Sequence, residues 1–352
     1  MKIGFLYYDF YPVMGGASVH GFYLAKELSQ LGHTLFKING EEDPYTTKYS
    51  NRLIGFLKIL RECDLIYLRI DYFLKLRNLA LLFAILFRKK VIVELNSPSD
   101  EMLLFGKKRS YLKKADKILS ILLKRADAVI VVSKAIERYC KESLLLNSEK
   151  VHVVENGGVV FDEENNADFG PVSNEVVIQI KAIQSRFKKI AVWAGSTNKM
   201  QNFGVIERIS DGKANDTAIV VIANEEKGQP IELKADNIFL FRNVSRADVI
   251  HIIQSSDVGL AFYENYDWCR WGFYNSSLKT YEFLNNGLLT ISNKNGTEIQ
   301  RKYPNFKTVS EIDEIFEILN SELPEIKKKF KVRTWKDVGI EVNMIITNLF
   351  ED

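Results

Sequence analysis

Cysteine and histidine are scarce in this 352-residue chain, and their spacing excludes several kinds of site. The three cysteines, Cys63, Cys140 and Cys269, are odd in number and far apart, whereas a disulfide framework or a zinc site needs paired ligands. The four histidines form no short-spaced pair with one another or with a cysteine. We therefore expect no metal, and a reducing compartment such as the cytoplasm.

Long apolar runs and an excess of one charge are absent as well. The longest apolar run, 79–87, falls well short of the roughly 20 residues that span a bilayer, so no membrane crossing is expected. The first residues, with one lysine and an early Asp9, are typical of a strand and not of a secretion signal. With 48 basic and 45 acidic residues, the net charge of +3 is too small to indicate a nucleic-acid partner.

The chain instead alternates between strand-like and helix-like segments. Helical patterns cover 134–142, 175–187 and 247–254, and the apolar run 79–87 is expected to form a buried helix. Between them, strands are expected at 3–7, 65–70, 91–95, 128–132, 151–155, 190–194, 218–222, 238–241 and 258–262, and the continuous apolar run 128–132 is typical of a fully buried parallel strand. This alternation predicts right-handed βαβ units and parallel sheets that helices cover on both faces.

An acidic, polar stretch at 161–174 interrupts this rhythm and is typical of a linker. We therefore expect an α/β protein of two Rossmann-like, doubly wound domains, an N-terminal one at residues 1–165 and a C-terminal one at residues 166–333. The helical pattern at 334–352 is expected to pack back toward the N-terminal domain. Because ligands bind at the carboxyl ends of parallel strands, the site should lie in a cleft between the two domains.

The sharpest local pattern is the segment 278–291, a predicted helix that a glycine ends and a strand follows. Asn275 and Ser277 precede it as N-cap candidates, so free backbone amides there could hold a phosphate, with Lys279 adding charge. Glu282, three residues after Lys279, could accept hydrogen bonds from ribose hydroxyls. The plainer alternative is that Glu282 closes a capping box with Ser277 or pairs with Lys279 on a solvated face.

Several other segments complete a pattern along the chain. They are, in order, Gly15-Gly16-Ala17-Ser18-Val19-His20, Val132-Ser133-Lys134, Glu155-Asn156-Gly157-Gly158, Trp193-Ala194-Gly195-Ser196 and the helix from Ser277 to Gly287. In this order and spacing, the chain resembles the family-4 retaining glycosyltransferases of the GT-B fold over nearly its full length. The resemblance implies a nucleotide-diphosphate sugar held mainly by the C-terminal domain, retaining transfer without a metal, and no other cofactor.

The resemblance also implies which residues form the site. It places Glu282 on the ribose, Lys279 near the diphosphate, and the backbone of Gly15-Gly16 beside the departing diphosphate. The catalytic candidates are Asn96 and Glu282, and the donor-binding candidates are Gly15, Gly16, Ser196, Lys199, Asn275, Ser277, Leu278, Lys279 and Glu282. Two positions depart from the family pattern, since Tyr274 stands where many members carry a further glutamate and Asn96 where relatives often carry histidine.

Two further patterns each allow two interpretations. The basic amphipathic segment 107–125 could rest on an anionic membrane, but we favour a solvated helix whose apolar stripe faces its own core. The aromatic residues after the predicted strand 258–262 could stack on a sugar or a base, or pack in the core. They are Tyr263, Tyr266, Trp268, Trp271, Phe273 and Tyr274.

These observations predict a cytoplasmic, hexosyltransferase-like glycosyltransferase of polysaccharide or glycolipid assembly, at the inner membrane face if segment 107–125 contacts lipid. Its partners would be a nucleotide sugar and a glycan or lipid-linked glycan acceptor, without nucleic acid. Two rivals suit the same scaffold: a nucleotide-sugar 2-epimerase, which needs no acceptor, and a catalytically silent binding subunit. The epimerase is disfavoured because this sequence has no evident pair of carboxylates or histidines for acid–base chemistry.

Overall fold

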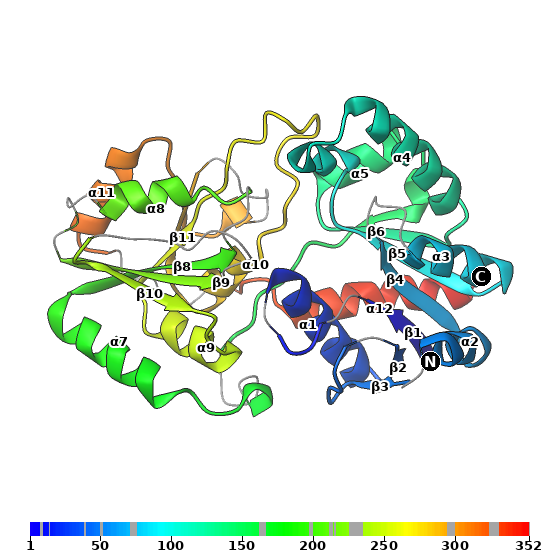
Figure 1. Ribbon diagram of the computed structural model, residues 1–352, viewed down its shortest axis with the longest axis horizontal. Helices are drawn as coiled ribbons and strands as arrows, with labels where there is room; N and C mark the ends of the chain where they lie inside the picture. Colours follow the sequence, from blue (N-terminus) through cyan, green and yellow to red (C-terminus); the bar gives the residue numbers. More distant parts are fainter. Residues whose placement is uncertain are drawn as a thin grey trace.

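The computed structural model describes the chain except residues 8–9, 14, 39, 50–51, 71–75, 162–166, 197–199, 211–213, 215, 225–234, 294–299, 324–330 and 352. Figure 1 shows two separate β-sheets side by side, each covered by helices. All pairs between the named strands are parallel. Each sheet defines one lobe of the protein.

The N-terminal lobe is built on a seven-stranded sheet of order β3-β2-β1-β4-β5-β6-β7. The order reverses between β1 and β4, the kind of point at which doubly wound folds bind ligands. The strands are β1 (Lys2–Leu6), β2 (Thr34–Lys37), β3 (Thr46–Lys48), β4 (Leu65–Ile70), β5 (Lys90–Leu95), β6 (Ala128–Val131) and β7 (Val151–Val153). The helices are α1 (Gly16–Gln30), α2 (Arg52–Glu62), α3 (Leu76–Leu86), α4 (Arg109–Leu123) and α5 (Lys134–Glu142), with 3-10 turns η1 (Ser99–Phe105) and η2 (Ser148–Lys150).

The C-terminal lobe is built on a six-stranded sheet of order β10-β9-β8-β11-β12-β13, which reverses between β8 and β11. The strands are β8 (Lys189–Ser196), β9 (Thr217–Asn224), β10 (Ile238–Arg242), β11 (Val258–Ala261), β12 (Leu289–Ser292) and β13 (Phe306–Thr308). The helices are α7 (Asn174–Arg186), α8 (Phe203–Ser210), α9 (Arg246–Gln254), α10 (Leu278–Asn285) and α11 (Ile312–Asn320), with 3-10 turns η3 (Ala167–Phe169) and η4 (Gln300–Lys302).

These two sheets confirm the predicted α/β class with two doubly wound parts. The apolar runs form central strands because both faces of a parallel sheet are covered, and all four residues of β6 are buried. Helix α5 has the predicted bounds, 134–142. It begins there because the Ser133 hydroxyl accepts a hydrogen bond from the backbone N–H of Ile136, as an N-cap does.

Two passages of the chain between the lobes, at Gly157–Gly158 and at Arg333–Thr334, run side by side. The backbone N–H of Gly158 in the first passage donates to the carbonyl oxygen of Arg333 in the second, at 3.0 Å. A Cβ on Gly157 would lie 2.3 Å from the carbonyl carbon of Thr334, and one on Gly158 would lie 2.4 Å from the carbonyl oxygen of Tyr281. This close approach of backbones explains the two consecutive glycines.

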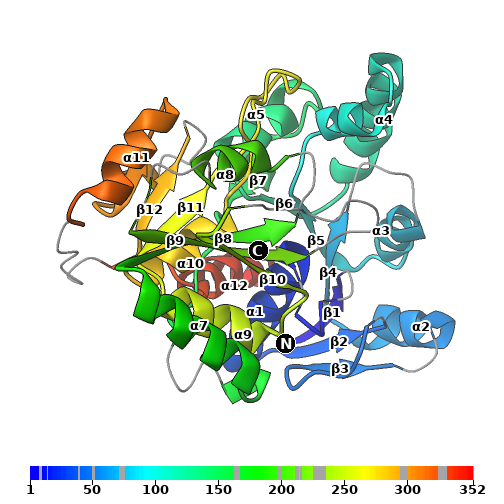
Figure 2. The same ribbon diagram turned by 60° about the vertical axis from the view of Figure 1, so that its left-hand side comes forward.

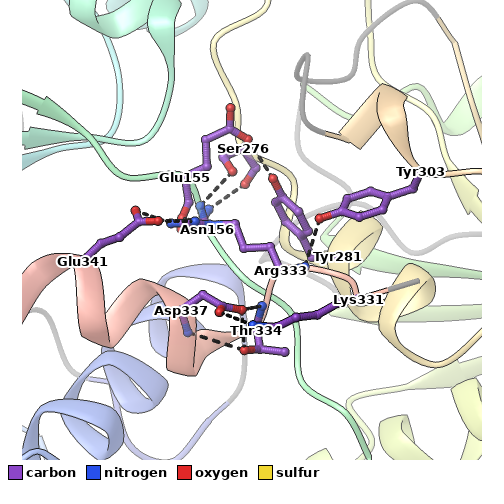
Figure 3. A network of polar contacts seen from close by, with 10 residues as sticks. All are labelled: Glu155, Asn156, Ser276, Tyr281, Tyr303, Lys331, Arg333, Thr334, Asp337 and Glu341. Carbon is purple, nitrogen blue, oxygen red and sulfur yellow. Dashed lines mark hydrogen bonds and ion pairs between the residues drawn. The ribbon is translucent and has the colours of Figure 1, made fainter. Parts of the chain in front are cut away.

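Arg333 fastens this crossing to both lobes, as Figure 3 shows. Its guanidinium donates to both carboxylate oxygens of Glu341 at 2.6 and 2.7 Å, and its Nε donates to the backbone oxygen of Glu155 at 3.0 Å. The Glu155 carboxylate accepts a hydrogen bond from the Tyr281 hydroxyl on α10 at 2.7 Å. Because a bidentate arginine pair is directional, this network fixes where α10 lies relative to the N-terminal lobe.

The last helix, α12 (Trp335–Glu351), packs against α1 although it follows the C-terminal lobe in sequence. A Cβ on Gly339 would lie 2.5 Å from the Cβ of Glu27, and His33 Nε2 lies 2.7 Å from Asn343 Oδ1. The domain boundary expected at residue 165 falls outside the described residues, so the domain limits stay a prediction.

Residues 262–277, between β11 and α10, extend from the C-terminal lobe to the N-terminal lobe, and we call this segment the strap (Figure 1). Arg270 donates to the Asp100 carboxylate at 2.8 and 2.9 Å, and the Tyr274 hydroxyl donates to Glu101 at 2.8 Å. The aromatic rings of the strap pack on one another and on the N-terminal core, namely Tyr263, Tyr266, Trp268, Trp271, Phe273 and Tyr274. These contacts support the core-packing interpretation of the aromatic cluster.

Helix α3 corrects one prediction. The run 79–87 is helical as far as Leu86, but it is not buried: only its inner side chains, such as Leu81 and Ala84, are enclosed by the sheet. The outward side chains are exposed, namely Leu79, Leu82, Phe83, Leu86 and Phe87. The helix lies at the edge of the lobe, where the described residues offer no element to cover its outer side. None of the described helices has the length and apolar content to cross a bilayer.

Helix α4 has the arrangement that the favoured interpretation of segment 107–125 requires. Its apolar stripe is buried against its own lobe and consists of Leu112, Ala115, Leu119 and Leu123. The acidic residue of the helix, Asp116, is also buried and accepts a hydrogen bond from the Tyr139 hydroxyl at 2.6 Å. The basic residues of the segment therefore carry its outward face.

Candidate active site

Two helices from different lobes begin at the same place. Gly16 is the first residue of α1 and Leu278 the first of α10, and a Cβ on Gly16 would lie 3.5 Å from Leu278 Cδ1. Before α1, the Gly15 N–H donates to Ser18 Oγ at 2.8 Å, and that hydroxyl donates to the Gly15 carbonyl at 2.8 Å. Helix N-termini present free amides and partial positive charge, so an anion at this junction is attracted by both lobes.

Lys279 brings a titratable ammonium group to this junction. Its Nζ donates to Gln201 Oε1 at 2.6 Å and lies 4.7 Å from the ring centroid of Trp193 and 5.3 Å from that of Tyr263. Burial lowers the pKa of Lys279 to about 7. A Cβ on Gly195, at the end of β8, would lie 3.3 Å from this Nζ, which explains the glycine. Of the carboxylates that the structure describes, none forms an ion pair with Lys279, so the desolvated ammonium favours an external anion.

The polar residues before α10 have structural partners. Ser277 Oγ accepts a hydrogen bond from the Thr280 backbone N–H at 3.3 Å, which makes Ser277 the N-cap that the sequence indicates. The Asn275 side-chain amide donates to the Tyr266 hydroxyl at 2.6 Å and so joins the end of the strap to its middle. These side chains order the first turn, while the backbone amides of Leu278-Lys279 lack intrahelical partners, as in any α-helix.

Glu282 forms a buried ion pair with Arg246 of α9, with side chains only 7% and 8% exposed. One guanidinium nitrogen of Arg246 lies 3.4 Å from Glu282 Oε2 and the other bonds to Oε1. Although burial opposes it, the Glu282 charge raises the pKa of Arg246 above its ordinary value. Arg246 also lies over the Tyr23 ring of α1, at 6.0 Å from the centroid. Glu282 therefore neither caps with Ser277 nor pairs with Lys279.

Asn96 adjoins a buried carboxylate at the carboxyl end of β5. Its Nδ2 donates to Glu94 at 2.6 Å, and the hydroxyls of Tyr7 and Tyr67 donate to the same carboxylate at 2.6 and 2.7 Å. Burial by itself would raise the pKa of Glu94. The pKa is nevertheless held well below its usual range by the nearby His20, whose Nε2 lies 3.3 Å away, and by these hydrogen bonds. Asn96 Oδ1 is buried and accepts no hydrogen bond from any described residue, so it can accept one from a ligand.

The remaining two donor-binding candidates follow β8. Ser196 is the last residue of β8 and pairs with Asn224 of β9, and Lys199 lies outside the described residues. The structure thus brings together Gly15-Gly16 and Leu278-Lys279, and it places Asn96 and Glu282 in two separate polar clusters.

Sequence reasoning missed the partners of the candidate residues, namely Gln201, Arg246 and Glu94. A charged residue inside the apolar run 91–95 was a usable signal for Glu94, because a buried carboxylate needs several donors. Arg246 gave no such signal, since it lies 36 residues from Glu282. In the described part of the chain, no cluster of histidine, cysteine and acidic residues could hold a metal ion.

Residues 14–157 match the model of glycosyltransferase family 4. The whole chain is similar in structure to a glycosyltransferase from Rickettsia africae, with a TM-score of 0.66, 16% identity, and coverage of 100% of this chain and 99% of that chain. For Anabaena HepE in complex with UDP-glucose, the TM-score is 0.60, the identity 15% and the coverage 100% and 98%. For the lipopolysaccharide outer core galactosyltransferase WaaB, the TM-score is 0.52, the identity 10%, and the coverage 99% of this chain and 99% of that chain.

Comparison with curated protein sequences gave no significant match. The structural similarities, at 10–16% identity, establish the fold, while the family match covers the lobe that carries the glycine loop. The chain therefore has the two-lobed GT-B fold of these glycosyltransferases, and its residues 14–157 are similar to glycosyltransferase family 4.

Proposed function

We propose that the protein transfers a hexose-type sugar from a nucleoside diphosphate sugar to a glycan or lipid-linked glycan acceptor, with retention and without a metal ion or other cofactor. The observation that carries this proposal is the meeting of Gly15-Gly16 with the start of α10, beside Lys279. An ammonium in a desolvated setting and two helix N-termini form an anion site that suits a diphosphate.

In this proposal the junction acts on the leaving group. As the sugar–phosphate bond breaks, negative charge grows on the diphosphate, and donors already in place stabilise that charge without reorganising. The donors are the backbone amides at the start of α1 and α10 and the ammonium of Lys279. Charge supplied in this way performs the task that a divalent cation performs elsewhere, which is why we propose metal-independent transfer.

Glu282 and Asn96 would position the two ends of the donor. The Glu282 carboxylate, with Arg246 on one side, retains lone pairs that can accept hydrogen bonds from the ribose hydroxyls. Asn96 Oδ1, oriented by the hydrogen bond from its own Nδ2 to Glu94, can accept one from a sugar hydroxyl. Ser196 and Lys199 complete the donor-binding set of the proposal.

Two of the structurally similar proteins suggest which nucleotide and which acceptor to test. HepE was crystallised with UDP-glucose, so uridine is the first base to test here. WaaB is a lipopolysaccharide galactosyltransferase, which supports an acceptor in surface-polysaccharide or glycolipid assembly. The free, buried thiols of Cys63, Cys140 and Cys269 suit a cytoplasmic protein, and we propose that it works at the inner face of a membrane.

Titration calorimetry with uridine, guanosine and adenosine diphosphates tests the donor site. We expect one of the three to bind, and the absence of binding by all three would refute the donor assignment. A Glu282→Gln variant keeps the size of the side chain and one acceptor oxygen, so it should weaken binding about tenfold through loss of charge. Unchanged affinity in this variant would remove Glu282 from the ribose site.

Product analysis then tests transfer itself. Incubation of the bound nucleotide's glucose and galactose derivatives with glycan or glycolipid acceptors should release nucleoside diphosphate and form a product of retained anomeric configuration. Conversion of the donor without an acceptor would indicate the epimerase instead. Nucleotide binding with neither transfer nor donor hydrolysis above background would indicate a silent subunit.

A further inference from the structure

An exposed apolar face covers the outer side of the N-terminal lobe. The outward residues of α3 at 79, 82, 83 and 86, with Phe87 directly after the helix, follow the i, i+3, i+4, i+7, i+8 spacing of a single helix stripe. Exposure reaches 65% for Leu86 and 47% for Phe87. Because the inner residues are also apolar, residues 79–86 of α3 are apolar around the whole circumference, which is typical of a helix that is covered on both sides.

Helix α2 continues this face. The ring of Phe56 on α2 meets the ring of Phe83 on α3 edge-on, with centroids 6.3 Å apart, so the two helices are in contact. Three further large apolar residues of α2 are exposed, namely Leu53, Ile54 and Leu57. We call the exposed apolar residues of α2 and α3 the apolar face. Exposed apolar residues gathered on two helices in contact mark an interaction site, since isolated surface leucines would be scattered.

A basic border adjoins the apolar face. Between residues 105 and 125, all of which the structure describes, every exposed charged side chain is positive, because Asp116 is buried. The basic residues are Lys107, Lys108, Arg109, Lys113, Lys114, Lys117, Lys124 and Arg125. Figures 1 and 2 both place α2, α3 and α4 along one edge of the N-terminal lobe, and α3 contacts α4, so the helices that carry the basic and the apolar residues are neighbours.

Charge decides which occupant fits. A second copy docked through the same face by a two-fold axis would bring two basic borders together, which is unfavourable. A nucleic acid would use the basic border but would leave the apolar face in water. An anionic bilayer satisfies both parts, because phosphate headgroups attract lysine and arginine while the acyl boundary receives apolar side chains.

We propose that the apolar face and the basic border of α4 form a docking surface for an anionic lipid bilayer. The stripe of α3 enters the boundary between headgroups and acyl chains, and the lysines and arginines of α4 lie among the headgroups. The sequence pattern of 107–125 suggested membrane contact through α4 alone. The structure instead gives the apolar role to α2 and α3, because the stripe of α4 is buried. This inference does not depend on the proposed donor.

Co-sedimentation with vesicles tests this surface, using phosphatidylcholine alone and a 70:30 mixture of phosphatidylcholine and phosphatidylglycerol. We expect binding to the mixed vesicles, little binding to the neutral ones, and weaker binding as salt increases. A Leu86→Ser/Phe87→Ser variant should bind the mixed vesicles roughly tenfold more weakly. The matched control is Ile178→Ser on α7, whose side chain is 67% exposed on the other lobe, and it should bind like the wild type.

A second variant tests the charge. Lys113→Gln/Lys114→Gln/Lys117→Gln should lose about tenfold or more in binding to the mixed vesicles, since each basic residue contributes near an anionic surface. Its matched control neutralises Lys181, Lys302 and Lys307, which are exposed on the C-terminal lobe. Uridine diphosphate binding should be unchanged in all four variants, so failure of this proposal is distinguishable from failure of the donor site.

Three outcomes would overturn the proposal. The first is absence of binding to the anionic vesicles. The second is equal loss in the test variants and in their controls. The third is a wild-type dimer that the Leu86→Ser/Phe87→Ser variant converts to a monomer in sedimentation analysis, which would make the apolar face a contact between copies of this chain.

Discussion

Replacement of Lys279 by methionine should separate the binding role of this residue from its effect on stability. The pKa of Lys279 is lowered from 10.5 to about 7 because burial removes water from the ammonium. A depression of this size corresponds to roughly 4–5 kcal/mol, since each pKa unit is about 1.4 kcal/mol. The side chain retains partial contact with solvent, which screens part of that cost, so we expect about 1–3 kcal/mol of added stability in Lys279→Met at pH 7.

The assay is urea unfolding of the ligand-free protein at pH 7 and pH 9. The unfolded chain holds the Lys279 proton up to pH about 10.5 and the folded chain only up to about 7, so wild-type stability should rise with pH in this window. Lys279→Met lacks this proton and should lack its share of the slope. The same variant should bind uridine diphosphate at least tenfold more weakly. A variant that is less stable than the wild type yet binds normally would refute the reasoning.

Three further predictions concern Lys279, the Arg246–Glu282 ion pair and the close approach at Gly158. In calorimetry, the affinity of the wild type for uridine diphosphate should fall by up to about tenfold per pH unit from pH 7 to 9, because the diphosphate binds the charged form of Lys279. The Lys279→Arg variant keeps its charge over this range, so its affinity should depend less on pH. Arg246→Met or Glu282→Gln alone should lower the free energy of unfolding in urea by about 3–5 kcal/mol, because each single change leaves an unpaired buried charge. The double variant should lose less than the sum of the two single losses, and additive losses would contradict the ion pair. Gly158→Ala should lower the free energy of unfolding by about 2 kcal/mol or more, because its Cβ would lie 2.4 Å from the Tyr281 carbonyl oxygen. The control is Gly204→Ala, whose Cβ would have its nearest contact at 3.7 Å, and an equal loss in this variant would argue against the steric cause.

The strands and the helices with strong local signals were predictable. Apolar runs such as 128–132 form central strands because a buried parallel strand requires apolar side chains on both faces. Ser133 and Ser277 cap α5 and α10 as their positions indicate, since capping depends on residues three apart. The capped start of α10 was therefore predictable from the sequence, and its role as an anion site stays a prediction.

Features that depend on distant contacts were not predictable in the same way. The outer side of α3 has the composition of a core, and whether another element covers it is a property of the whole fold. Glu282 pairs with Arg246 of another helix, and no local spacing indicates that pair. The strap joins the N-terminal lobe through Arg270 and Asp100, which are 170 residues apart.

The central claim is that a nucleoside diphosphate binds where α1 and α10 begin. A crystal structure of the protein with uridine diphosphate, or with whichever base binds in calorimetry, tests it most directly. The account predicts phosphate oxygens about 3 Å from Lys279 Nζ and from the backbone amides of Leu278-Lys279, next to Gly16. A nucleotide bound elsewhere, with this junction occupied only by protein side chains, would contradict it.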